Sequence, residues 1–199
     1  GSSLAWGISY ARADDFWSFF DAEGQGIVVA NIDTGVQWTH PALDPSSKSS
    51  ANPADPACWF DPVGTCTTGP CDPDGHGTHT MGTMVGDNDA SLAYQVGMAP
   101  DAQWIACRGC VGESCSDLAV NACADWILAP DDDPANRPHV VNNSWDGARG
   151  DLWYQAKVQA WVAAGIFPAF SAGNGGSGCA TLTSPGEYPE SFTSGAHDM

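Results

Sequence analysis

Short apolar runs alternate along the chain with longer amphipathic stretches. Four runs of the first kind are free of charged residues and are flanked by glycine, proline or polar residues: 27–32, 103–107, 139–143 and 166–170. A short and nearly continuous apolar run is typical of a β-strand that is covered on both faces. These four segments are therefore predicted to form the core strands of a parallel sheet.

Helical spacing of small and apolar residues marks four further segments, which lie before and between the predicted strands: 15–20, 78–85, 117–128 and 152–162. We expect Asp14 or Asp15 to cap the first helix, because a carboxylate accepts hydrogen bonds from the free N–H groups of a helix start. For the same reason we expect Asp151 to cap the last helix. Gly165 is expected to end that helix as its C-terminal glycine.

The alternation of strand and helix predicts an α/β fold. Parallel strands that follow one another need helical crossovers, which are right-handed and which cover the faces of the sheet. We therefore predict a three-layer, doubly wound and mainly parallel sheet. The sequence contains no internal repeat and no interdomain linker, so residues 1–199 are predicted to form one unit without a second domain.

Polar residues follow the predicted strands, where α/β sheets place their functional sites. Asp33 comes directly after the first run, and Asn174 lies in a glycine-rich turn after the fourth. His76 stands among glycines at a predicted helix start, where a general base and a structural helix cap fit equally well. Together, however, a carboxylate, an imidazole and a side-chain amide fit acyl transfer. The carboxylate orients the imidazole, the imidazole deprotonates a nucleophile, and the amide stabilises an oxyanion.

Charge and cysteine content narrow the class of protein. The 24 acidic residues against six basic ones give a net charge of −18, which argues against nucleic-acid binding because that function needs a basic face. No run is long and apolar enough to span a membrane, and no signal peptide is visible. Eight cysteines favour disulfides and an oxidising, extracellular compartment. We expect local disulfides within the clusters 58/66/71 and 110/115/123, one of them in the long loop 44–75, and a free apolar thiol at Cys107.

Three segments resemble the signatures of a known family. They are 31–36 (Asn-Ile-Asp-Thr-Gly-Val), 74–79 (Asp-Gly-His-Gly-Thr-His) and 170–174 (Phe-Ser-Ala-Gly-Asn). All three look like signatures of the subtilisin-like serine proteases, the subtilases. Further stretches, among them 36–43 and 140–145, are similar to the bacillopeptidase F branch of that family. The resemblance covers nearly the whole chain and implies a subtilisin-like fold.

The resemblance implies a role for each candidate residue. Asp33 would hold the imidazole of His76, which would act as general base and then as general acid, and Asn174 would donate its amide to the oxyanion. Six residues would border the substrate, four on a segment that pairs with its backbone and two on another wall: Ser144, Trp145, Asp146, Gly147, Ala172 and Gly173. The implied activity is a secreted serine endopeptidase that acts on protein or peptide substrates and needs no cofactor for its chemistry.

The nucleophile of the family is missing from this sequence. No Gly-Thr-Ser occurs, and Ser194 aligns with a core strand position of the family. Three explanations stay open: a truncated sequence, a serine carried by a second, C-terminal polypeptide, or an inactive protein that binds peptides or proteins. We therefore expect residues 1–199 to be the N-terminal portion of a subtilase catalytic domain, with its C-terminal part missing and no activity on its own.

Three positions depart from the family pattern or from the local pattern. Asp146 stands where the family usually has glycine, and three interpretations stay open: its carboxylate crowds the substrate strand, favours a basic residue near the scissile bond, or turns to solvent. Ala42 occupies a position at which many subtilases carry a calcium-binding aspartate, so a structural calcium ion is left without assigned ligands. Asn31 is a polar residue inside an apolar run, and the sequence gives no reason for it.

Overall fold

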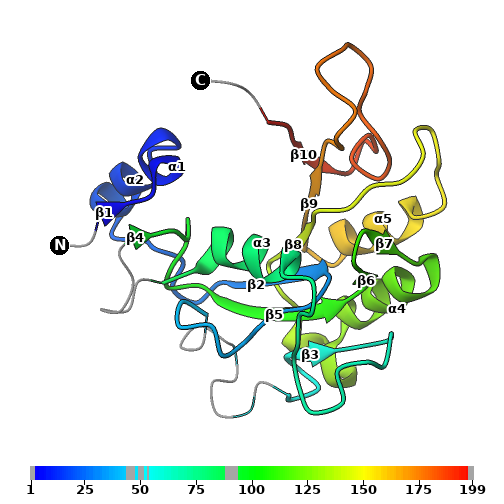
Figure 1. Cartoon of the computed structure of the whole chain (residues 1–199), viewed down its shortest axis with the longest axis horizontal. Coiled ribbons are helices and arrows are strands. Elements are labelled where there is room, and N and C mark those ends of the chain that lie inside the picture. The colour runs from blue at the N-terminus through cyan, green and yellow to red at the C-terminus, as the bar shows by residue number, and fades with distance from the viewer. Residues whose placement is uncertain (1–2, 44–47, 49–51, 53, 88–93, 197–199) are drawn as a thin grey trace.

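A six-stranded parallel sheet forms the centre of the protein, and its strand order is β10-β9-β8-β2-β5-β3 (Figure 1). The computed structural model describes residues 3–43, 48, 52, 54–87 and 94–196. The strands of the sheet are β2 (Val28–Asp33), β3 (Trp59–Phe60), β5 (Gln103–Arg108), β8 (Val140–Asn143), β9 (Phe167–Ser171) and β10 (Phe192–Ser194). The predicted parallel α/β sheet is thus confirmed.

The four predicted strands are all present, and no end of any of them differs from the prediction by more than one residue. The first of them, β2, includes Asp33 as its last residue. The strand that the family resemblance implies around Ser194 is present as β10. The two-residue strand β3 was not predicted, because it lies inside a polar loop and its few residues carry no periodic signal.

Helices cover both faces of the sheet. Helix α3 (His76–Val85) lies on one face, whereas α4 (Asp117–Leu128) and α5 (Gln155–Ala163) lie on the other. Side chains of β2 alternate between the two cores, because successive residues of a strand point to opposite faces. Ala30 and Ile32 pack into the core with α4 and α5, and Val29 packs into the core with α3. The predicted three-layer arrangement is confirmed.

Two short helices precede the sheet, α1 (Trp6–Tyr10) and α2 (Ala13–Phe20). They lie at one end of the molecule, next to the small sheet of β1 (Ser3–Leu4) and β4 (Tyr94–Gln95) (Figure 1). The predicted cap of α2 is wrong. Asp14 and Asp15 lie inside its first turn, and the capping position belongs to Arg12, which takes a left-handed conformation without a side-chain cap. The tight turn from α1 into α2 therefore fixes where the second helix begins.

The start of helix α5 also differs from the prediction. Asp151 accepts a hydrogen bond from the backbone N–H of Trp153 at 3.1 Å and forms a turn ahead of the helix, which begins only at Gln155. Tyr154, at the N-cap, is fully buried, and its hydroxyl donates to the carbonyl oxygen of Val120 on α4 at 3.1 Å. Packing of this tyrosine against α4 thus decides where α5 begins. The predicted end is confirmed, since Gly165 follows α5 with a φ of 81°.

Three disulfides join segments around the carboxyl end of the sheet. Cys66–Cys71 and Cys110–Cys115 are local, as expected, and the second closes the hairpin of β6 (Cys110–Val111) and β7 (Ser114–Cys115). The expected free thiol at Cys107 is wrong, because Cys107 is bonded to Cys123. Cys107 points from β5 toward α4, where Cys123 lies equally buried. Within the described residues no helix has the length and apolar character needed to cross a bilayer.

Candidate active site

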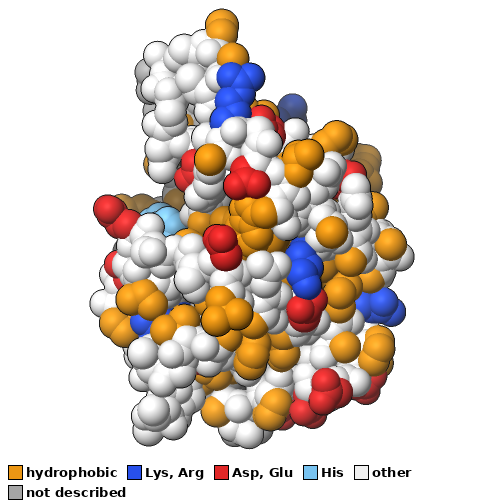
Figure 2. Space-filling model, turned by 90° about the vertical axis from the view of Figure 1, so that its right-hand side faces the viewer, with side chains coloured by type: hydrophobic (Ala, Val, Ile, Leu, Met, Phe, Trp, Pro, Cys, Tyr) orange, Lys and Arg blue, Asp and Glu red, His pale blue; other side chains and the backbone are white. Residues whose placement is uncertain are grey.

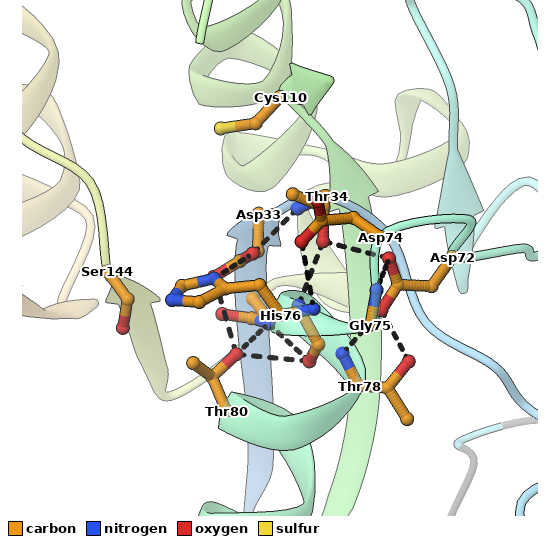
Figure 3. A network of polar contacts seen from close by, with 12 residues as sticks. Asp33, Thr34, Asp72, Asp74, Gly75, His76, Thr78, Thr80, Cys110 and Ser144 are labelled. Atoms are coloured by element: carbon orange, nitrogen blue, oxygen red, sulfur yellow. Dashed lines mark hydrogen bonds and ion pairs between the residues drawn. The ribbon is translucent and has the colours of Figure 1, made fainter. Parts of the chain in front are cut away.

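Asp33 and His76 meet at the carboxyl end of β2, where α3 begins (Figure 3). Nδ1 of His76 lies 2.7 Å from Oδ1 of Asp33. Asp33 is only 2% exposed, and it also accepts hydrogen bonds from the backbone N–H of Thr34 at 2.7 Å and from the Thr80 hydroxyl at 3.3 Å. An ionised carboxylate can only accept, so Nδ1 carries the proton and Nε2 keeps a free lone pair.

The two groups of this pair perturb each other. Burial raises the pKa of Asp33, and the hydrogen bonds from His76, Thr34 and Thr80 act in the opposite direction. The hydrogen bond to Asp33 raises the pKa of His76, and the negative charges of Asp33, Asp74 and Asp72 add to that effect. The side chain of His76 is 51% exposed. Its ring therefore has one nitrogen fixed by a buried carboxylate and the other open toward the side on which Ser144 lies (Figure 3).

A second carboxylate holds the start of α3 against β2. Asp72 accepts hydrogen bonds from the backbone N–H groups of Gly75 and Thr78, at 2.9 and 2.8 Å, and from the hydroxyl groups of Thr34 and Thr78. Thr34 Oγ1 in turn accepts from the backbone N–H of Gly77 at 2.9 Å. Burial raises the pKa of Asp72, but these hydrogen bonds outweigh it and the net shift is downward. Asp72 thus fixes the first turn of the helix that carries His76.

Asn31, which the sequence left without explanation, ties the same helix to the sheet. Its Nδ2 donates to the Gly77 carbonyl at 3.2 Å and to the Thr80 hydroxyl at 2.9 Å. Its Oδ1 accepts from Asn142 Nδ2 on the neighbouring strand β8, and that nitrogen also donates to Ser144 Oγ at 3.0 Å. A continuous polar network therefore connects the histidine helix with the segment that follows β8.

A cleft of about 750 Å³ opens over the carboxyl ends of β2 and β8. Asp33 and His76 line it, together with Asn174 and all four residues of the segment 144–147. Asn174 is exposed, and within the described part of the chain its amide has no hydrogen-bond partner. The cleft therefore unites seven of the nine residues that the sequence nominated.

The remaining two nominated residues lie beside this cleft. Ala172 and Gly173 line a neighbouring hollow, which shares only Asn174 with the cleft. The backbone N–H of Ala172 donates to Ser194 on β10 at 2.9 Å, which ties the Asn174 turn to the edge of the sheet. The two residues thus directly precede Asn174, and Gly173 lies against Asp146 of the cleft wall, where an added Cβ would be 3.0 Å from the Asp146 carboxylate.

The segment 144–147 is anchored at both ends. Trp145 is 8% exposed, and its ring packs edge-on against Tyr154 and Phe170 in the core. The backbone N–H of Gly147 donates to the carbonyl oxygen of Ser184 at 2.8 Å. Another part of the cleft wall is the β6–β7 hairpin, whose ends are joined by the Cys110–Cys115 disulfide. Both parts of the wall are therefore held in place by buried or covalent contacts.

The described residues contain no group of three or more His, Cys, Asp or Glu side chains arranged to hold a metal ion. The acidic loop 131–133 belongs to the short helix η1 (Pro130–Asp132) and to the cap of η2 (Pro134–Asn136), where Asp133 accepts from the N–H of Ala135. Asp133 therefore has a structural role as a helix cap.

Sequence reasoning missed the residues that position the pair. Asp72, Thr34 and Thr78 clamp the helix start, and Asn142 continues the Asn31 network. The Asp-Pro-Asp-Gly stretch ahead of the helix was an available signal for the clamp, because carboxylates gather at helix N-termini. No such local signal points to Asn142, whose partner lies 111 residues away in the sequence.

The parallel three-layer fold, with an aspartate at a strand end bonded to a histidine at a helix start, is that of the subtilases. Residues 24–199 match the subtilase family, and the chain belongs to that family.

Individual relatives agree with this assignment. The chain is 41% identical over 213 residues to bacillopeptidase F of Bacillus subtilis (strain 168), an alignment that covers 98% of this chain and 14% of that protein. It is 30% identical to subtilisin E of the same organism, over 98% of this chain and 46% of the relative. It is 28% identical to the serine protease AprX, over 88% of this chain and 39% of the relative. The chain thus spans less than half the length of these three relatives.

Proposed function

We propose that this chain provides the aspartate, the histidine and the oxyanion donor of a serine endopeptidase that hydrolyses proteins or peptides. The observation that carries the proposal is the 2.7 Å hydrogen bond between Asp33, which is buried, and His76, which is half exposed in a cleft. Such a pair leaves Nε2 of the histidine as a proton acceptor with a fixed direction.

The proposed reaction follows from these positions. His76 Nε2 takes the proton of a serine hydroxyl as its oxygen attacks the substrate carbonyl, and Asp33 stabilises the imidazolium that forms. The amide of Asn174 donates to the oxyanion of the tetrahedral intermediate. His76 then returns the proton to the leaving amine, and a water molecule hydrolyses the acyl-enzyme by the same steps. The proposed chemistry uses side chains and water only.

The serine is the part that these 199 residues do not supply, since the sequence contains no Gly-Thr-Ser. We propose that a polypeptide segment outside the chain brings it to the open side of the His76 ring. Membership of the subtilase family supports a serine nucleophile, and the Nε2 side of the ring, which has no hydrogen-bond partner among the described residues, supports its approach. The three disulfides support a working place outside the reducing cytoplasm, so we propose that the protein is secreted.

The experiment is peptide hydrolysis by the full-length protein that contains this chain. Variants Asp33→Asn, His76→Ala and Asn174→Ala are compared with the matched control His79→Ala, an exposed histidine on the same helix that does not line the cleft. The first three variants lose activity by roughly 10² or more, and the control retains it. Equal loss in the control would mean that the helix, and not the pair, is responsible.

An inactive protein that binds peptides is the second candidate, and the missing Gly-Thr-Ser is the observation that favours it. It predicts that the full-length protein binds peptides without cleaving them and that His76→Ala changes neither property. Hydrolysis that depends on His76 would exclude this second candidate.

A further inference from the structure

The cleft around His76 is negatively charged throughout. Among the described residues, six carboxylates and no lysine or arginine line it: Asp33, Asp74, Glu113, Asp117, Asp146 and Asp151. The cation next in sequence, Arg149, is engaged elsewhere, with the carbonyl oxygen of Ala180 at 2.6 Å and with Glu187 at 3.8 Å. Figure 2 shows acidic side chains and some basic ones spread among apolar side chains on the side of the molecule that carries α4 and α5. A positively charged substrate group would therefore meet attraction and no competitor in the cleft.

One of these carboxylates is built into the wall next to Asn174. Asp146 Oδ2 accepts a hydrogen bond from the Thr183 hydroxyl at 2.8 Å. A methyl group added at Gly173 would come within 3.0 Å of the same Oδ2 and closer still to Thr183 Oγ1, so only glycine leaves room for this pair. Because Gly173 directly precedes Asn174, the carboxylate lies within one residue of the proposed oxyanion donor.

The backbone around Asp146 is fixed as well. The N–H of Gly147 donates to the carbonyl oxygen of Ser184, so two hydrogen bonds join residues 146–147 to residues 183–184. Trp145, which precedes Asp146 and also lines the cleft, has a buried indole N–H with no hydrogen-bond partner in the described chain. A buried polar group without a partner is uncommon in a protein core and calls for an explanation, such as a bound water molecule or ion.

We propose that Asp146, held in place by Thr183, selects lysine or arginine as the substrate residue whose carbonyl group is attacked. The proposal rests on the proposed peptidase function. That carbonyl binds Asn174, so the side chain of the same substrate residue extends along the wall that Asp146 and Gly173 share. Thr183 occupies one carboxylate oxygen, and the other, which has no partner among the described residues, can accept a charge-assisted hydrogen bond from an ammonium or guanidinium group. Asp146 is then the specificity residue, and Thr183 is its positioning residue.

The test uses the full-length protein and fluorogenic peptides that differ only at this residue: arginine, citrulline or leucine. Citrulline keeps the shape of arginine without its charge. Wild type prefers arginine over citrulline in kcat/KM by roughly ten- to a hundredfold, as expected for a hydrogen bond between charged groups. Asp146→Asn lowers that preference to about threefold or less. Glu113→Gln, which removes the same charge from the hairpin wall, changes the preference by less than about twofold.

The positioning role has its own comparison. Thr183→Val lowers the arginine preference through KM, and Thr183→Ser, which keeps the hydroxyl, restores it. This pair also decides the matter if the Asp146 variant fails to fold. A wild-type preference near one, or an equal loss in Asp146→Asn and Glu113→Gln, would overturn the specificity proposal alone, since leucine peptides would still be cleaved. Failure to cleave any of the peptides would overturn the proposed function with it.

Discussion

The contact between Gly77 and the turn after β2 controls the position of His76. Gly77 is buried on α3, directly after the histidine. A Cβ atom added there would lie 3.1 Å from Asp33 Cβ, 3.0 Å from the Gly35 nitrogen and closer still to the Gly35 carbonyl oxygen. The last of these contacts is with rigid backbone. The variant Gly77→Ala therefore forces the start of α3 away from β2.

The size of the effect follows from this overlap. Relief of the clash requires a movement of about 1 Å, and a misplacement of that size in a catalytic group costs about a hundredfold in rate. Because His76 and Asp33 are joined by a single 2.7 Å hydrogen bond, the movement acts directly on that bond. We expect kcat/KM of Gly77→Ala in the full-length protein to fall by about a hundredfold on a fluorogenic peptide.

The same helix supplies the control. No described atom lies within 4 Å of a Cβ added at Gly82, and a helix interior favours alanine over glycine by about 1 kcal/mol. Gly82→Ala should keep its kcat/KM within about twofold and raise the melting temperature. Wild-type activity in Gly77→Ala, or equal damage in Gly82→Ala, would refute the argument that close approach of α3 sets the histidine.

Three further outcomes are expected. The hydrogen bond to Asp33 raises the pKa of His76 above its ordinary 6.5, and the base form is lost as pH falls through that raised pKa, so the acid limb of the kcat/KM profile lies above pH 6.5. Asp33→Asn moves this limb to lower pH, and a limb that does not move would contradict the pairing. Asn174→Ala lowers kcat roughly 10²- to 10³-fold with little change in KM, a magnitude known from subtilisin itself; a change confined to KM would remove Asn174 from the oxyanion role. The Cys107–Cys123 disulfide joins residues 16 apart, and replacing both cysteines by serine lowers the free energy of unfolding in denaturant by about 3 kcal/mol. The same change at Cys66–Cys71, with a separation of five, lowers it by about 2 kcal/mol, and equal losses would contradict the loop-entropy reasoning.

The sheet and the pair were predictable because their signals are local. Each core strand is a continuous apolar run, and such runs need both faces covered. Asp33 and His76 each stand in a short motif at an element boundary, and parallel topology brings those boundaries to one edge of the sheet. The order of the motifs along the chain was therefore enough to nominate them together.

The errors arose where distant packing overrides local preference. Cys107 reads as an apolar strand residue, and only the approach of α4 turns it into a disulfide partner. Asn31 looks misplaced in its strand until α3 and Asn142 supply its partners. Helix α5 begins later than its spacing suggests, because the buried side chain of Tyr154 takes the N-cap position. In each case the deciding contact joins elements far apart in the sequence.

The central claim is that Asp33 and His76 activate a serine outside these 199 residues. It is tested most directly by labelling the full-length protein with a fluorophosphonate and mapping the label by mass spectrometry. We predict one labelled serine, outside the 199 residues, and labelling that is slower by roughly three orders of magnitude or more in His76→Ala. Absence of labelling, a label within the chain, or a labelling rate that is the same without His76 would contradict the account.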